Sequence, residues 1–185
     1  MKNLETISDL ALMQLIKSGD IDKLAILYER YKKPLFSYFI RLSGNRERSE
    51  DMVQTVFYRI LKAHKQFRAK SKFTTWMFSI AHNVLVDSFK KRENKNLLSD
   101  MTEFENKETG TGIIDEIEKK EQIELLKIAM KKLSIDKREP LVLSRYEGMK
   151  YKEIAKVMGL SESAVKVRVF RAIEELRQIY LVISN

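Results

Sequence analysis

The sequence predicts an all-α protein with two small helical domains joined by a flexible acidic linker, the C-terminal domain being a helix-turn-helix. Its 185 residues include only two prolines and six glycines, so residues that break helices are rare. In both halves, apolar residues recur at the three- and four-residue spacing of amphipathic helices. Residues 94–112 lack that periodicity. We therefore place the domains at residues 1–95 and 117–185, with a linker at 96–116.

Composition narrows the class of protein and its partners. A net charge of +9 favours a polyanionic partner. With no cysteine and two histidines, the chain is not expected to form disulfides or to bind a metal or another cofactor. The segment MKNLETISDL has no apolar core typical of a signal peptide, and polar residues interrupt the apolar stretch at 76–86. We expect a soluble cytoplasmic protein without membrane insertion.

The first two helices are delimited by polar and turn-forming residues. Ser8 is an N-cap candidate for the first helix and Asp20 for the second, because their side chains can accept a backbone N–H. Pro34 is expected to kink the second helix or to start a new turn, since it lacks an N–H. Ser43 and Gly44 are expected to end it.

A third helix is expected from about Arg46 to Gln66, with one apolar and one polar face. The polar face includes Asp51, Gln54, Thr55 and Tyr58. An exposed aromatic among short polar groups is typical of a protein–protein contact, where aromatic side chains dominate the binding energy. A simply solvated face is equally consistent with these residues alone.

We expect a basic loop at 68–72, followed by a fourth helix at 73–92 that is capped by Thr74 or Thr75. Together they have the composition of a single-strand binding surface. Residues 59–92 hold nine Lys or Arg against one acid, a net +8. Cations suit phosphates, rings suit base stacking and an amide suits base edges. The candidates are Arg68, Lys70, Lys72, Trp76, Asn83, Lys90 and Lys91. For Trp76, a buried packing role is about as consistent with the sequence as a contact with a base. Residues 93–124 then hold ten acids against four lysines, a net −6.

The C-terminal half predicts further helices at 117–133 and 136–146, followed by a helix-turn-helix at 151–172. Gly159 can adopt the left-handed conformation that ends a helix, because it has no Cβ. Ser161 is a suitable N-cap for the next helix. Apolar residues on both helices, such as Ile154 and Val165, can pack across this turn.

The last helix carries unusual residues opposite its apolar stripe. These are Ser163, Lys166, Val167, Phe170 and Arg171. In a DNA major groove, Val can contact a thymine methyl and Arg can donate two hydrogen bonds to guanine. An amphipathic helix with two stray surface hydrophobes is the alternative interpretation.

Together, two blocks of the chain resemble bacterial RNA polymerase sigma factors of the extracytoplasmic-function (ECF) branch. The blocks are DMVQTVFYRILKAHKQF with FTTWMFSIAHNVLVDSFKKR, and PLVLSRYEGMKYKEIAKVMGLSESAVKVRVFRAIEEL. The resemblance implies an N-terminal domain (region 2) that binds core RNA polymerase and melts the downstream (−10) element. It implies a C-terminal domain (region 4) that reads the upstream (−35) element, and an anti-sigma factor as a possible further partner.

The resemblance also implies roles for individual residues. Asp51 and Gln54 match positions that contact the polymerase clamp, and Thr55 stands where the family often has Glu. Asn83 and the loop at 68–72 match positions near the separated strands. The basic residues of the recognition helix are matched by Lys166, Arg168 and Arg171, whereas Ala164 and Val167 depart from the common Thr and Ser.

Two other classes of protein are consistent with the residues. A two-domain helix-turn-helix repressor or activator would bind duplex DNA without polymerase. A DNA-acting enzyme would require a carboxylate cluster, whereas the acids here lie mainly in the linker. No nucleophile–base pair or glycine-rich phosphate loop is evident, so we do not expect an enzyme.

Overall fold

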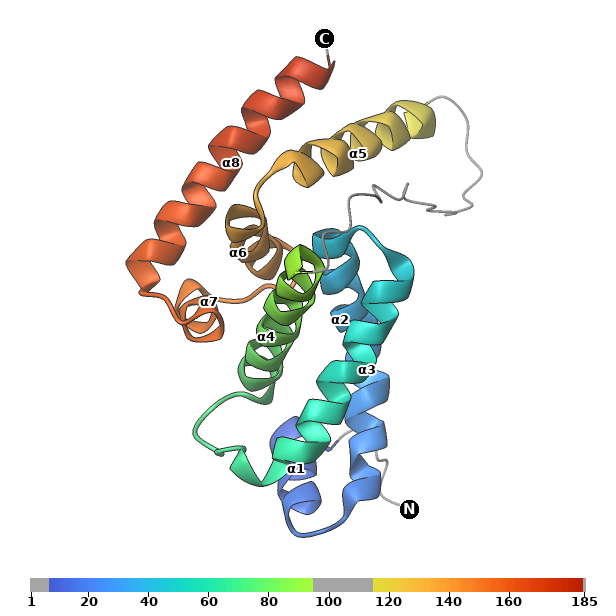
Figure 1. Ribbon diagram of the computed structural model, residues 1–185, viewed down its shortest axis with the longest axis vertical. Coiled ribbons are helices and arrows are strands. Elements are labelled where there is room, and N and C mark those ends of the chain that lie inside the picture. Colours follow the sequence, from blue (N-terminus) through green and yellow to red (C-terminus); the bar gives the residue numbers. More distant parts are fainter. Residues whose placement is uncertain (1–6, 95–114, 185) are drawn as a thin grey trace.

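A computed structural model describes residues 7–94 and 115–184, and all regular structure in these ranges is helical, which confirms the predicted class. The N-terminal group contains α1 (Asp9–Lys17), α2 (Leu24–Ser43), α3 (Arg46–Ala63) and α4 (Phe73–Asn94), with short 3-10 turns at Ile21–Lys23 and His64–Gln66. The C-terminal group contains α5 (Asp115–Lys132), α6 (Ile135–Arg145), α7 (Tyr151–Met158) and α8 (Glu162–Ser184) (Figure 1).

The N-terminal helix boundaries match some of the expected caps. Ser8 accepts a hydrogen bond from the backbone N–H of Ala11 at 3.3 Å, as expected. Asp20 was a wrong choice, because it makes no capping hydrogen bond and precedes a 3-10 turn. α2 continues through Pro34 and ends at Gly44, whose φ of 70° is left-handed.

The start of α4 also differs from the expectation. The helix begins at Phe73, and the N–H of Trp76 donates to the carbonyl of Lys72 at 3.2 Å. Lys72 therefore stands just before the first turn, where Thr74 or Thr75 was expected to cap. Thr75 is instead buried, because it lies on the side of α4 that faces the protein interior.

An aromatic cluster holds the loop between α3 and α4 against the core. The rings of Phe67 and Trp76 lie 5.3 Å apart, and the ring of Phe73 lies 5.4 Å from that of Tyr31 on α2. Lys17 on α1 donates its ammonium to the carbonyl of Phe67 at 2.9 Å. These contacts fix both ends of the basic loop at 68–72.

The helix-turn-helix forms as the sequence predicts. Gly159 ends α7 with a φ of 65°. Ser161 accepts the backbone N–H of Ala164 at 3.1 Å and so caps α8. Val165 of α8 and Ile154 of α7 are fully buried between the two helices. The orientation of α8 is set by its packing on α7 together with α5 and α6.

The two helical groups pack against each other. α4 contacts α7, and α2 contacts α6 (Figure 1). Their buried apolar residues form one continuous cluster that spans both groups. The linker expected at 96–116 lies outside the described residues except for 115–116, which belong to α5.

The left-handed turn at Gly159 leads to a stability prediction. We expect Gly159→Ala to lower the free energy of unfolding by about 1–2 kcal/mol, because L residues are strained at this φ. A Cβ there would meet no atom within 4 Å, so the cost is conformational and not steric. Asn tolerates this conformation better. Urea unfolding should thus show a smaller loss for Gly159→Asn, and equal losses for both variants would contradict this explanation.

Candidate functional site

The polar face of α3 presents an exposed aromatic side chain to solvent. Tyr58 is 59% exposed, and Asp51 and Gln54 are exposed beside it on the same helix. The ammonium of Lys62 lies 5.4 Å from the Tyr58 ring, which is a cation–π distance. We call Asp51, Gln54, Thr55 and Tyr58 the α3 surface. A partner that covered the Tyr58 ring would bury a large apolar area.

Two contacts of this region were not evident from the sequence. The hydroxyl of Thr55 donates to the backbone carbonyl of Asp51 at 2.8 Å, so it is engaged within the helix. Arg59 forms an ion pair with Asp87 of α4 at 2.8 Å. This pair links α3 to the outward side of α4, the side that carries Asn83.

The candidates for single-strand binding spread over the basic loop and one side of α4. Arg68 and Lys70 are exposed in the loop, and Asn83, Lys90 and Lys91 are exposed along the helix. Their cations give this side a positive potential that favours phosphates.

Trp76 differs from these neighbours. It is half-buried, and its ring packs against Phe67 and, with centroids 6.3 Å apart, against Phe73. The structure therefore gives Trp76 the packing role that the sequence left open beside base stacking.

The outer face of α8 is exposed where the sequence predicts a recognition helix. Val167 is 47% exposed and Phe170 is 66% exposed, and Ser163 and Arg171 are exposed on the same helix. Val165, Val169 and Ala172 are buried on the opposite side. Because the apolar stripe is fully used for packing, Val167 and Phe170 are not needed for the fold.

The basic residues of α8 differ in their availability. The ammonium of Lys166 forms an ion pair with Glu162 at 3.2 Å, one turn earlier. Arg168 is partly buried and lies near Asp136. A hydrogen bond from Ser134 is the largest cause of the lowered pKa of Asp136, and the charge of Arg168 adds to it. Of the expected basic contacts, Arg171 is therefore the most open to a ligand.

A buried carboxylate joins the two helical groups, and the sequence analysis did not identify it. Glu139 of α6 is 3% exposed. Its Oε1 accepts the hydroxyl of Tyr38 from α2 at 2.6 Å and the Nδ1–H of His82 from α4 at 2.7 Å. The sequence signal was an acid at an apolar-stripe position of α6, three and four residues before the buried Val142 and Leu143.

These contacts shift two pKa values. The hydrogen bond to Glu139 raises the pKa of His82 above its ordinary 6.5, although burial acts in the opposite direction. Burial raises the pKa of Tyr38 well above its ordinary value, and the charge of Glu139 adds to this effect. Tyr38 therefore remains a neutral donor, whereas His82 can carry a positive charge near neutral pH.

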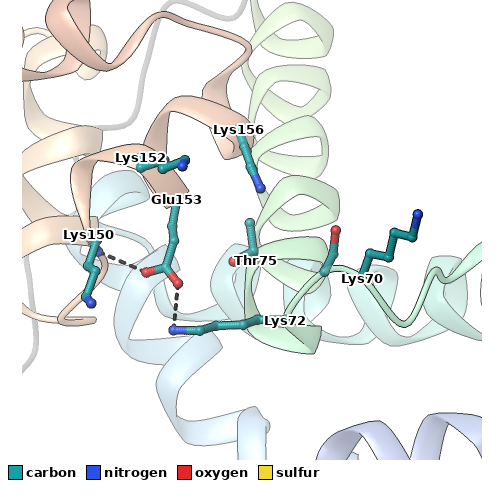
Figure 2. Close-up of a pocket in the computed structure, with 8 residues that line it drawn as sticks. Lys70, Lys72, Thr75, Lys150, Lys152, Glu153 and Lys156 are labelled. Atoms are coloured by element: carbon teal, nitrogen blue, oxygen red, sulfur yellow. Dashed lines mark hydrogen bonds and ion pairs between the residues drawn. The ribbon is translucent and has the colours of Figure 1, made fainter.

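A basic hollow lies between the two helical groups, where the basic loop and α4 meet α7. It has a volume of about 300 Å³. The basic loop and α4 line one side and α7 the other, with Lys70, Lys72, Thr75, Lys150, Lys152, Glu153 and Lys156 around it (Figure 2). Five of the lining residues are lysines and one is a glutamate. The hollow is therefore strongly positive.

Glu153 organises this hollow. Its Oε1 lies 2.8 Å from the ammonium of Lys72, and its Oε2 accepts the backbone N–H of Lys150 at 3.0 Å (Figure 2). The hydrogen bond from Lys72 lowers the pKa of this carboxyl below its ordinary value. One of the candidate single-strand contacts, Lys72, is thus paired with the C-terminal group in this arrangement.

Within residues 7–94 and 115–184, we find no group of three or more histidine, aspartate or glutamate side chains able to hold a metal ion. None of the helices in these ranges combines the length and the apolar character needed to cross a bilayer.

Comparisons with known proteins match both helical groups. The family model for Sigma-70 region 2 matches residues 27–95. The family model for Sigma-70, region 4 matches residues 123–176. The ECF RNA polymerase sigma factor SigX of Bacillus subtilis is 26% identical over 157 residues, which cover 83% of this chain and 81% of SigX.

Two solved structures share the fold. CnrH, solved in complex with the cytosolic domain of CnrY, superposes with a TM-score of 0.71 at 23% identity, covering 97% of this chain and 99% of CnrH. The sigma factor RpoE of Bartonella quintana, solved with the anti-sigma factor NepR, gives 0.69 at 23% identity, covering 88% and 98%. With both regions matched in this order, the chain belongs to the ECF-type RNA polymerase sigma factors, which act in promoter-specific transcription initiation.

Proposed function

We propose that residues 1–95 bind core RNA polymerase and the downstream (−10) element, while residues 117–185 read the upstream (−35) element. The observation that carries this division is the exposure of Val167, Phe170 and Arg171 on a recognition helix whose core stripe is complete without them. Such a helix face suits a major groove. The chain is expected to act in the cytoplasm, where polymerase and DNA are found, without a cofactor or enzymatic activity of its own.

The α3 surface is the proposed contact for polymerase. Tyr58 would supply a buried aromatic anchor, with Asp51 and Gln54 as polar contacts around it. The contribution of Thr55 is smaller in this proposal, because its hydroxyl already donates within the helix.

The proposed downstream contacts divide by chemistry. Asn83 would read a base edge, because an amide can both donate and accept hydrogen bonds. Arg68, Lys70, Lys72, Lys90 and Lys91 would bind phosphates, and Lys72 would first have to leave Glu153. Trp76 would support the fold of the loop, and it would stack on a base only through the part of its ring face that Phe67 and Phe73 leave exposed.

An anti-sigma factor is the proposed regulatory partner. RpoE of Bartonella quintana was solved with such a partner, the anti-sigma factor NepR, and shares this fold. An anti-sigma factor would prevent transcription by covering one of the surfaces described above.

The proposal is tested by transcription from core polymerase and this chain alone. DNA selected from a random pool by the complex should yield a defined transcript, and the polymerase alone should yield none. Binding of the chain to selected duplex without any transcript would instead favour a repressor or activator.

Tyr58→Ala should weaken binding to core polymerase by about 2 kcal/mol, since it removes the proposed aromatic anchor. Phe170→Ala is the matched control, because it removes another exposed aromatic from a helix that we assign to DNA. Fluorescence titrations with core polymerase should show a loss for Tyr58→Ala alone, at unchanged helicity. An equal loss for both variants would refute the assignment of the α3 surface.

The two DNA surfaces should respond to different substitutions. Arg171→Ala should weaken binding of upstream duplex by about 1–3 kcal/mol if Arg171 donates two hydrogen bonds to a guanine. Asn83→Ala should instead weaken binding of downstream single strands, because Asn83 lies on the other helical group. Paired titrations with polymerase holoenzyme and each DNA measure both effects. The division of labour is wrong if each variant affects both ligands equally.

A further inference from the structure

The contact between the two helical groups includes a buried polar cluster beside its apolar residues. Both hydrogen-bond donors to Glu139 come from the N-terminal group, Tyr38 from α2 and His82 from α4. Tyr38 is fully buried and Glu139 nearly so. Burial of a carboxylate is costly unless hydrogen bonds replace its water. These two donors therefore allow α6 to pack against the N-terminal group, and separation of the groups would return Glu139 to water.

Two weaker contacts accompany this one at the surface. The guanidinium of Arg41 on α2 lies 4.2 Å from the ring centre of Tyr146, just after α6. Lys72 pairs with Glu153 of α7. Against them acts the mutual repulsion of the lysines on the two sides of the basic hollow. These polar contacts thus add to the apolar cluster that also holds the two groups together.

The closed arrangement is too short to read two separate promoter elements. Elements at −10 and −35 lie roughly 25 base pairs apart, which is about 85 Å of duplex at 3.4 Å per base pair. The 23-residue helix α8 is about 35 Å long at 1.5 Å per residue. It packs on α7, which packs on α4. The DNA-facing sides of α4 and α8 therefore cannot reach both elements until the groups separate.

We propose that Glu139, Tyr38 and His82 form a proton-dependent latch that holds the free protein closed and must open before both promoter elements are read. The need for opening rests on the proposed function, whereas the latch itself is a property of the free chain. In the closed form Glu139 acts as a positioning residue, because it contacts neither DNA nor polymerase.

The direction of the pH effect follows from His82. Its pKa in the closed form is raised above its ordinary 6.5 by the hydrogen bond to Glu139. Protonated His82 therefore favours closure; this contribution is complete below about pH 6.5 and is lost as the pH rises through the raised value. Alkaline conditions should open the protein.

Other charged groups near the latch either titrate outside the range from pH 7 to pH 8.5 or keep the same charge throughout it. Glu147, between α6 and α7, faces Tyr38, and burial raises its pKa to about 6, with Arg41 of α2 partly opposing the shift. Its titration is largely complete above pH 7. Arg41 stays charged, and Tyr38 stays neutral. Between pH 7 and pH 8.5, His82 is thus the group whose charge changes at the contact.

The experiment measures the distance between the groups in the free chain. Because the chain has no cysteine, dyes can be placed by Glu47→Cys on α3 and Arg177→Cys on α8, both at exposed positions outside the proposed binding surfaces. Energy transfer should be high at pH 7 and fall towards pH 8.5, the range in which Glu147 is already largely ionised. His82→Gln should remove this pH dependence. His64→Gln, which changes the other of the two histidines, should preserve it.

Matched variants separate the latch from general stability. Tyr38→Phe keeps the buried ring and removes the donor, and should lower the closed-to-open ratio by roughly tenfold or more, the effect of one hydrogen bond to a charged group. Tyr31→Phe removes a similar tyrosine–carboxylate bond, to Asp9, within the N-terminal group, and should leave the ratio unchanged. Glu139→Gln should remove most of the pH dependence and favour opening.

Two results would overturn the latch: energy transfer independent of pH in the parent chain, or a pH response that persists in His82→Gln. Neither measurement involves polymerase or DNA, so this test is independent of the proposed function. In a second step, core polymerase with selected promoter DNA should lower the energy transfer at pH 6.5. High transfer retained in an active transcription complex would refute the opening step and leave the sigma activity itself intact.

Discussion

A single buried carboxylate joins the two halves of this protein, beside the apolar cluster that spans both of them. Glu139 is nearly inaccessible to water, and its packing is possible because Tyr38 and His82 donate to it from the other helical group. A buried ion pair adds little net stability, but the loss of one partner is costly because the remaining charge stays buried. The contact therefore acts through specificity: it favours the relative placement of the two groups in which α7 packs beside α4.

The remaining candidate surfaces lie on different helices, so each partner in our proposal binds a different part of the molecule. The α3 surface carries an exposed aromatic, whereas the basic loop and α4 carry cations and the amide of Asn83. The Arg59–Asp87 ion pair connects these two surfaces within the N-terminal group. α8 presents the exposed face that we assign to DNA from a separate group. This arrangement suits a factor that contacts polymerase and two DNA elements, because each contact can form without displacing another once the groups are apart.

The sequence predicted what local physics determines. The left-handed turn at Gly159, the cap at Ser161 and the apolar stripes follow from short-range spacing, and the structure has them. The exposure of Tyr58 and Phe170 was also predictable, because each lies opposite a complete stripe. The Glu139 contacts were not, since they join residues 57 and 101 positions apart and have no periodic pattern. The sequence left two interpretations of Trp76 open for a related reason. Its ring packs against Phe67 across a loop, and the spacing of apolar residues does not determine the path of that loop.

His82 donates to the buried Glu139 across the contact between the halves, and an NMR titration of the His82 imidazole measures the effect of this hydrogen bond. The chain has two histidines, so a spectrum of His64→Gln assigns the signal without ambiguity. We predict that the pKa of His82 lies above 6.5 in the free chain, and that it returns towards the ordinary value in Glu139→Gln, where the charged acceptor is absent. A pKa at or below 6.5 that is unchanged by Glu139→Gln would contradict the account.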